Sequence, residues 1–155
     1  MFAHRLFASA FLVLCAPCAQ AQEPPKPVVA EARRLEAACE KFDPKAKAPP
    51  ERQISTPLND ARATIWIVDG SKTACGDSGP ACGSGGCMTI VYRAASANVA
   101  KIYGEQVLGW KIEDNRTSIL FDVHGSRCGG FGPDPCATRL DLATGKTRTF
   151  RPTAR

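Results

Sequence analysis

Apolar residues recur at helical spacing in residues 28–42, VVAEARRLEAACEKF. Ala32, Leu35, Cys39 and Phe42 stand at positions i, i+3, i+7 and i+10, so they form one stripe that can face a core. Charged residues cover the remaining surface of the segment. The pattern predicts a helix over residues 28–42, with Cys39 pointing inward.

Proline flanks this helix on both sides. Residues 22–27 are proline-rich, which predicts a loose segment before the helix. Pro44 stops the helical pattern, and a Pro-Pro pair follows shortly after it. Residues 43–57 are therefore expected to form an extended linker.

After residue 57 the sequence changes to short β-branched and aromatic runs, broken by Gly, Asp and Asn. Such runs predict strands, and no long helical pattern separates them, so parallel crossovers are not expected. The predicted fold class is α+β, with the N-terminal helix packed on a mainly antiparallel sheet or a small sandwich that disulfides cross-link. Residues 58–155 are expected to be the disulfide-rich β domain and to form one globular unit with the helix. The expected strands are residues 63–69, 88–94, 99–103, 106–113, 117–124, 138–142 and 146–150, the last two joined by a three-residue hairpin ending in Gly145.

The first 21 residues have the pattern of an export signal. A short basic start precedes an apolar run, and Ala-Gln-Ala ends the segment. The run is about 10 residues long, whereas a membrane-spanning helix needs about 20. We expect residues 1–21 to be a cleaved signal peptide, and the product to be periplasmic or secreted without a transmembrane segment.

The distribution of charged residues does not favour a nucleic-acid partner. The formal net charge is +5, from 20 basic and 15 acidic residues that are interleaved along most of the chain. A nucleic-acid groove requires a denser basic stripe with stacking aromatic residues. We therefore expect no nucleic-acid partner.

Cysteine is the most informative residue type. Cys15 and Cys18 would leave with the signal, so six of the eight cysteines remain, and an even number in an exported chain predicts disulfides. The remaining spacings do not supply the paired C-x2-4-C groups of a structural zinc site, and no C-x-x-C redox motif remains. We expect no metal or cofactor.

Two of the cysteine loops read almost alike. CGDSGPAC at residues 75–82 and CGGFGPDPC at residues 128–136 each follow an apolar strand and a Gly-Ser pair. If the two loops are equivalent, a disulfide between the two end cysteines closes each of them. Two schemes for pairing the six cysteines stay open. We favour Cys75–Cys82, Cys128–Cys136 and Cys39–Cys87 over the rival with Cys82–Cys87 and Cys39–Cys75.

The order of these motifs resembles a group of small exported proteins of Gram-negative bacteria that lack an assigned function. The resemblance rests on CGSGGC, a strand, a Trp-containing strand, VHGSRCGG with a later Cys, and a final hairpin, over about residues 61–150. It implies a periplasmic setting. It implies no activity, and no catalytic residue is carried over from it.

His124 is the one histidine after the signal segment. Asp122 lies two residues before it on a predicted strand, and Ser126 lies two residues after it. A hydroxyl nucleophile, a histidine base and an orienting carboxylate are the elements of a hydrolase. The alternative is a histidine hydrogen-bonded within the Cys128 loop, and we favour that alternative because no nucleophile motif accompanies His124.

The C-terminal hairpin and tail carry Lys146, Arg148, Phe150, Arg151 and Arg155. Such a surface suits an anionic envelope polymer or an acidic protein partner. The alternative is a solvated edge strand whose charges prevent aggregation. We expect the chain to be an exported, disulfide-stabilised binding or envelope-associated module without catalytic activity, and a small periplasmic hydrolase centred on His124 is the alternative.

Overall fold

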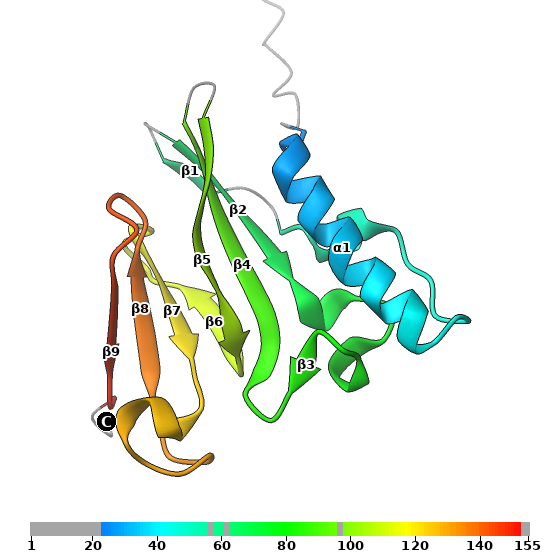
Figure 1. Ribbon diagram of the computed structural model, residues 1–155. Helices are drawn as coiled ribbons and strands as arrows, with labels where there is room; N and C mark the ends of the chain where they lie inside the picture. Colours follow the sequence, from blue (N-terminus) through cyan, green and yellow to red (C-terminus); the bar gives the residue numbers. More distant parts are fainter. Residues whose placement is uncertain (1–22, 56–57, 61–62, 96–97, 153–155) are drawn as a thin grey trace, which may run out of the picture.

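The computed structural model describes residues 23–55, 58–60, 63–95 and 98–152 (Figure 1). These residues form one α-helix and two antiparallel sheets with three disulfides, which confirms the predicted α+β class and its cross-linking. The expected signal peptide, residues 1–21, lies outside the described residues. Among those described, no helix is both long and apolar enough to cross a membrane.

The helix α1 extends from Lys26 to Phe42. It begins two residues before the predicted start, because a proline in the first helical turn costs no hydrogen bond. The prediction that Lys26 and Pro27 are loose is therefore wrong. Cys39 is fully buried as predicted, whereas Phe42 is 65% exposed because the last turn runs past the sheet (Figure 1).

The first sheet has the strand order β1-β2-β4-β3, and β5 pairs with β4. The continuous apolar run of β2 is explained by burial on both faces, since successive side chains of a strand point in opposite directions. Ile65 and Ile67 pack in the core shared with the second sheet, while Trp66 and Val68 pack in the core shared with α1. The strand bounds are β1 (Leu58–Asp60), β2 (Ala63–Asp69), β3 (Cys82–Gly83), β4 (Gly86–Ala95) and β5 (Asn98–Val107).

The second sheet has the order β6-β7-β8-β9. The prediction of one strand over residues 106–113 is wrong, because β5 ends at Val107 and β6 begins at Gly109. The N–H of Leu108 donates to the carbonyl of Asp122 at 2.7 Å, so the chain changes sheets at this residue. The bounds are β6 (Gly109–Ile112), β7 (Ser118–Asp122), β8 (Ala137–Asp141) and β9 (Thr147–Phe150).

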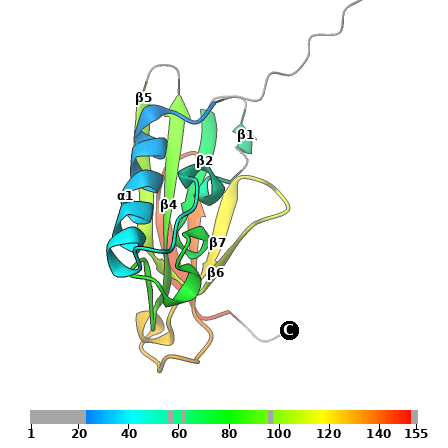
Figure 2. The same ribbon diagram turned by 90° about the vertical axis from the view of Figure 1, so that its right-hand side faces the viewer.

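Two apolar clusters lie on opposite faces of the first sheet. One cluster joins the first sheet to the second, and the rings of Tyr103 and Phe121 stack across it with centroids 4.1 Å apart. The other cluster joins the first sheet to α1 through Val28, Ala32 and Leu35. Figure 2 shows the helix lying along β4 and β2. Strands β2 and β4 are therefore packed on both faces.

The disulfides correct the pairing that the repeated loops favoured. Cys82 and Cys87 stand directly opposite each other where β3 pairs with β4, so the hairpin register itself brings them together. Cys39, on the buried face of α1, then lies beside the loop that contains Cys75. The two loops are therefore not equivalent, and only the second closes on itself; the bonds are Cys39–Cys75, Cys82–Cys87 and Cys128–Cys136.

A buried carboxylate connects α1 to the segment predicted as an extended linker. Glu36 is 4% exposed and accepts hydrogen bonds from Ala48 N and Gln53 Nε2, each at 3.0 Å, and from Ala74 N at 3.3 Å. The short 3-10 helix η1, Pro50–Gln53, turns the fully buried Gln53 toward this carboxylate. The described part of the linker is thus folded against the helix, because it satisfies a buried charge.

Candidate functional site

Three connections lie together at one end of the molecule, which we call the loop end. They are the β3–β4 turn, the β5–β6 connection at Leu108, and the disulfide-closed loop of residues 128–136 (Figure 1). Short 3-10 helices accompany them: η2 (Gly70–Lys72), η3 (Gly76–Ser78) and η4 (Gly125–Cys128). Loops on a rigid scaffold are a common location for binding residues, so the loop end is the candidate site.

The 128–136 loop is held by its own hydrogen bonds as well as by its disulfide. Asp134 accepts the N–H of Phe131 at 2.8 Å through its carboxylate, and the N–H of Asp134 donates to the carbonyl of Phe131 at 3.1 Å. The N–H of Gly125 donates to Gly132 O at 3.3 Å, and a Cβ on Gly125 would lie 1.8 Å from Phe131 O. This close backbone approach requires glycine at position 125.

Phe131 projects from this ordered loop and is 80% exposed. Among the described residues, the exposed large hydrophobic side chains are Phe131, Leu108 at 56% and Phe42 at 65%. Two of these three lie at the loop end. A single exposed apolar side chain is common on a protein surface, so the informative feature is that two of the three lie at the same end, one of them on a disulfide-closed loop.

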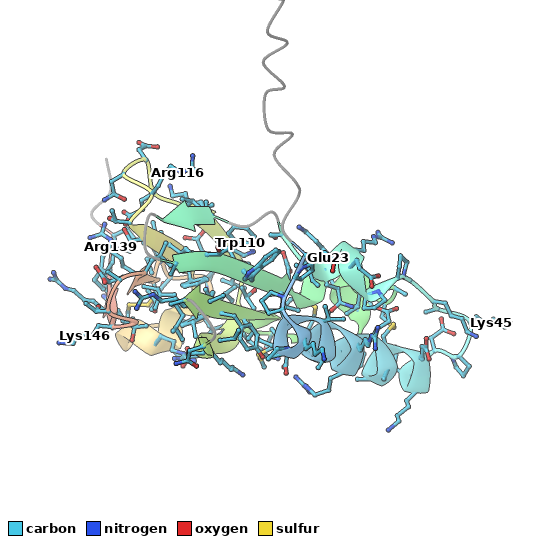
Figure 3. The ribbon with its side chains drawn as sticks, turned by 90° about the horizontal axis from the view of Figure 1, so that it is seen from above. Glu23, Lys45, Trp110, Arg116, Arg139 and Lys146 are labelled. Carbon is cyan, nitrogen blue, oxygen red and sulfur yellow. A yellow bond between two sulfur atoms is a disulfide. The ribbon has the colours of Figure 1, made fainter. Side chains whose placement is uncertain are left out.

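A pocket of about 490 Å³ opens beside the disulfide of β3 and β4. Two buried polar residues line it, Thr89 on β4 and Asp69, which is 8% exposed and lies at the end of β2. Asp69 accepts hydrogen bonds from Ser71 N at 3.0 Å, Ser71 Oγ at 2.7 Å and Trp110 Nε1 at 3.2 Å. The Trp110 contact joins the second sheet to the first (the position of Trp110 is labelled in Figure 3). Sequence reasoning missed Asp69, although an Asp before a Gly-Ser pair is a recognisable N-cap signal.

The other walls of this pocket combine charge with apolar surface. Lys72 and Asp77 line it as exposed residues, and Leu108 and the disulfide Cys82–Cys87 contribute apolar surface. Oxygen and sulfur atoms of Asp77, Cys82 and Cys87 lie within 4.8 Å of one another. Both sulfurs are engaged in the disulfide, so the group does not supply the thiolate ligands that zinc binds.

The structure brings His124 and Ser126 together but not Asp122. His124 Nδ1 lies 2.8 Å from Ser126 Oγ and accepts the N–H of Ser126 at 3.4 Å, so the ring caps η4. Strand β7 ends at Asp122, so the predicted alternation that would align Asp122 with His124 stops there. Among the described residues no hydrogen bond joins these two side chains. A smaller pocket of about 300 Å³ is lined by Ser84, Gly85, Gln106, His124, Ser126 and Arg127.

Arg148 stands opposite Arg139 where β8 pairs with β9, so both lie on one face of the second sheet, which we call the outward face because the buried Leu140 lies on the other. Arg148 and Arg151 are exposed, and Phe150 is half-buried beneath the guanidinium of Arg139, 5.5 Å from the ring centroid. Arg139 also pairs with Glu113 at 2.7 Å (Arg139 is labelled in Figure 3). Arg155 lies outside the described residues. A groove of about 690 Å³ on this face is lined by Lys111, Ile112, Glu113, Asp114, Leu120, Arg139, Phe150 and Pro152, two acids balancing two bases.

Glu113, which lines this groove, is expected to make the stability of the protein depend on pH. Hydrogen bonds from Ser118 and then Arg139 lower the pKa of Glu113 below its ordinary value. A depressed folded-state pKa adds stability above the unfolded pKa, near 4.3, and that stability is lost as the pH falls through the folded pKa. We expect Glu113→Gln to have a smaller drop in thermal midpoint between pH 7 and pH 3 than the unaltered chain. The control is Asp114→Asn, a neighbouring exposed carboxylate; equal drops in Glu113→Gln and the unaltered chain would contradict the assignment.

Comparison with protein-family models, with curated proteins and with solved structures gives no match. The residues of the loop end and of the outward sheet face are therefore the basis for a functional proposal.

Proposed function

We propose that this chain is an exported binding module that contacts a partner protein through its loop end. In this proposal residues 1–21 direct export to the periplasm or the medium, and the disulfides are compatible with an oxidising compartment. The two sheets form a small sandwich, and α1 covers its outer side as part of the frame. The observation that carries the proposal is the 80% exposure of Phe131 on a loop that is closed by a disulfide.

A constrained aromatic side chain is suited to protein recognition. Aromatic residues dominate the binding energy of many interfaces when they enter an apolar pocket of the partner. Binding also costs conformational entropy, and a loop already held by Cys128–Cys136 and the Asp134–Phe131 hydrogen bonds loses less of it. Leu108 adds a second apolar contact at the same end. The loop end thus offers a preorganised apolar contact surface.

The other candidate surfaces have weaker support. The outward groove around Arg139 and Phe150 carries balanced charge, which gives an anionic polymer little net attraction. The hydrolase alternative is favoured by the 2.8 Å contact between His124 and Ser126. However, the Nδ1 atom that faces Ser126 Oγ also accepts the Ser126 N–H, and Asp122 does not orient the ring. Binding remains the better-supported proposal.

The proposal is tested by photo-crosslinking in cells that export the chain. A benzophenone amino acid is placed at position 131 and, as a matched control, at position 42, since Phe42 is also an exposed phenylalanine but lies on α1. We expect a specific protein adduct from position 131 alone. Phe131→Ala should then weaken the affinity for that partner by about 30-fold or more, the range of an aromatic hot spot, while Phe42→Ala leaves it unchanged.

Two outcomes would contradict the proposal. One is equal crosslinking from positions 131 and 42, or a Phe131→Ala variant of unchanged affinity. The other is labelling of Ser126 by a fluorophosphonate probe that His124→Ala abolishes, which would favour the hydrolase instead.

A further inference from the structure

We infer that the Asp69 pocket is a binding site for an organic cation, namely an alkylguanidinium or alkylammonium group. This site shares Leu108 with the proposed contact surface but does not include Phe131, and it does not depend on the Phe131 contact. The inference rests on the burial of a charge without a counter-ion, on the chemistry of the surrounding walls, and on the size of the pocket.

Asp69 places a carboxylate in the pocket without an ion-pair partner among the described residues. The side chain is more than nine-tenths buried and lines an open pocket, yet within the described residues it forms no ion pair. Its donors are a backbone N–H, a hydroxyl and an indole N–H, which satisfy hydrogen bonds but leave the negative charge uncompensated. A buried carboxylate can be satisfied by hydrogen bonds alone, as Glu36 is, but Asp69 also lines an open pocket, so a cation from outside can reach its charge.

The walls of the pocket select an organic cation rather than a metal ion. Calcium and magnesium require six or more oxygen ligands or retained water around a compact site. Here the carboxylates of Asp69 and Asp77 are accompanied by Trp110, Leu108, Val107 and the disulfide Cys82–Cys87. An alkyl chain can pack on this apolar surface while its cationic end reaches a carboxylate and the indole ring.

Size and fixed geometry also fit this ligand class. The pocket volume of about 490 Å³ lies within the ordinary range of small-ligand pockets, which is roughly 300–1,000 Å³. The acceptor is fixed in place, because Ser71 holds one carboxylate oxygen and Trp110 holds the other. Lys72 lines the same pocket and is exposed, so its ammonium group competes with an incoming cation.

The test is a titration of the oxidised chain followed by ¹H–¹⁵N NMR of the two tryptophan indoles. Trp110 donates to Asp69, whereas Trp66 is buried between α1 and the first sheet and serves as an internal control. The probes are N-acetyl-arginine methylamide, free arginine, N-acetyl-norleucine methylamide and calcium chloride. We expect the arginine compounds to shift the Trp110 indole resonance and to leave Trp66 unchanged, with the norleucine compound at least about tenfold weaker.

Variants then assign the effect to the charges. Asp69→Asn keeps a hydrogen-bond acceptor, and it should weaken binding of the arginine amide about tenfold or more, in line with loss of a desolvated charge pair. Asp77→Asn should weaken binding to a smaller extent, and Lys72→Gln should strengthen it. Asp114→Asn, which removes an acid from the distant outward groove, should have no effect.

The outcomes separate the possible sources of the cation. Tighter binding of the arginine amide than of free arginine assigns the site to a side chain of a protein or peptide, and the reverse order assigns it to a free small molecule. Three results would overturn the inference. The norleucine amide could bind as tightly as the arginine amide, or calcium could cause the largest shift of the Trp110 indole resonance. The third is an unchanged affinity for the arginine amide in both Asp69→Asn and Asp77→Asn. Because the probes are small molecules, the result stands apart from the crosslinking test at Phe131.

Discussion

Replacing Cys39 and Cys75 together by alanine is expected to lower the free energy of unfolding by about 4 kcal/mol. This disulfide joins residues 36 apart in sequence, so its loss frees the longest closed loop of the three. In the chain-entropy account, a longer loop gives the unfolded state more freedom when the bond is absent. The same change also releases the C-terminal part of α1, because Cys39 is fully buried against the rest of the protein.

The measurement is urea-induced unfolding of the oxidised protein, with the other two bonds removed pairwise as controls. Those bonds join residues only 5 and 8 apart, so alanine pairs at Cys82–Cys87 and at Cys128–Cys136 should each cost about 2–3 kcal/mol. An equal loss in all three variants would show that loop length does not decide the stabilisation.

Glu36→Ala is expected to lower the free energy of unfolding by about 3–5 kcal/mol, because three donors lose their acceptor, one of them on the fully buried Gln53 and two partly buried. The donors are Ala48 N, Gln53 Nε2 and Ala74 N, from the linker and from the loop before Cys75. One carboxylate therefore holds three segments of the chain together. Glu36→Gln retains one acceptor oxygen, and it should recover part of the loss.

The matched control for this prediction is Glu40→Ala, which removes an exposed acid one turn further along α1. It should change the free energy of unfolding by less than about 0.5 kcal/mol, the usual range for a surface substitution. If Glu36→Ala were no more destabilising than Glu40→Ala, the network around Glu36 would not contribute to stability.

The periodicity of apolar residues was sufficient to predict most of the elements. The helical stripe placed Cys39 in the core, and the β2 run of residues 63–69 has the predicted bounds. Both results follow from local spacing. The division of residues 106–113 between two sheets does not, because it depends on a hydrogen bond from Leu108 to Asp122, a residue far along the chain.

The same distinction explains the disulfides and the candidate site. Similarity of the two Cys-Gly loops suggested equivalent bonds, whereas the pairing is fixed by the β3–β4 register, which puts Cys82 opposite Cys87. The pocket around Asp69 forms only when β6 brings Trp110 to the end of β2. His124 and Ser126 are near neighbours in sequence, so their contact was predictable, but the end of β7 at Asp122 was not.

The order of the disulfides along the chain has a consequence for biogenesis. The six cysteines of residues 23–152 bond strictly in consecutive pairs, first with second, third with fourth and fifth with sixth, so none of these bonds encloses or crosses another. If the chain is exported N-terminus first, as proposed, the next of these cysteines to emerge would always be the correct partner. A simple dithiol oxidase that joins thiols in order of appearance would yield the native set, with no need for an isomerase to exchange mispaired bonds.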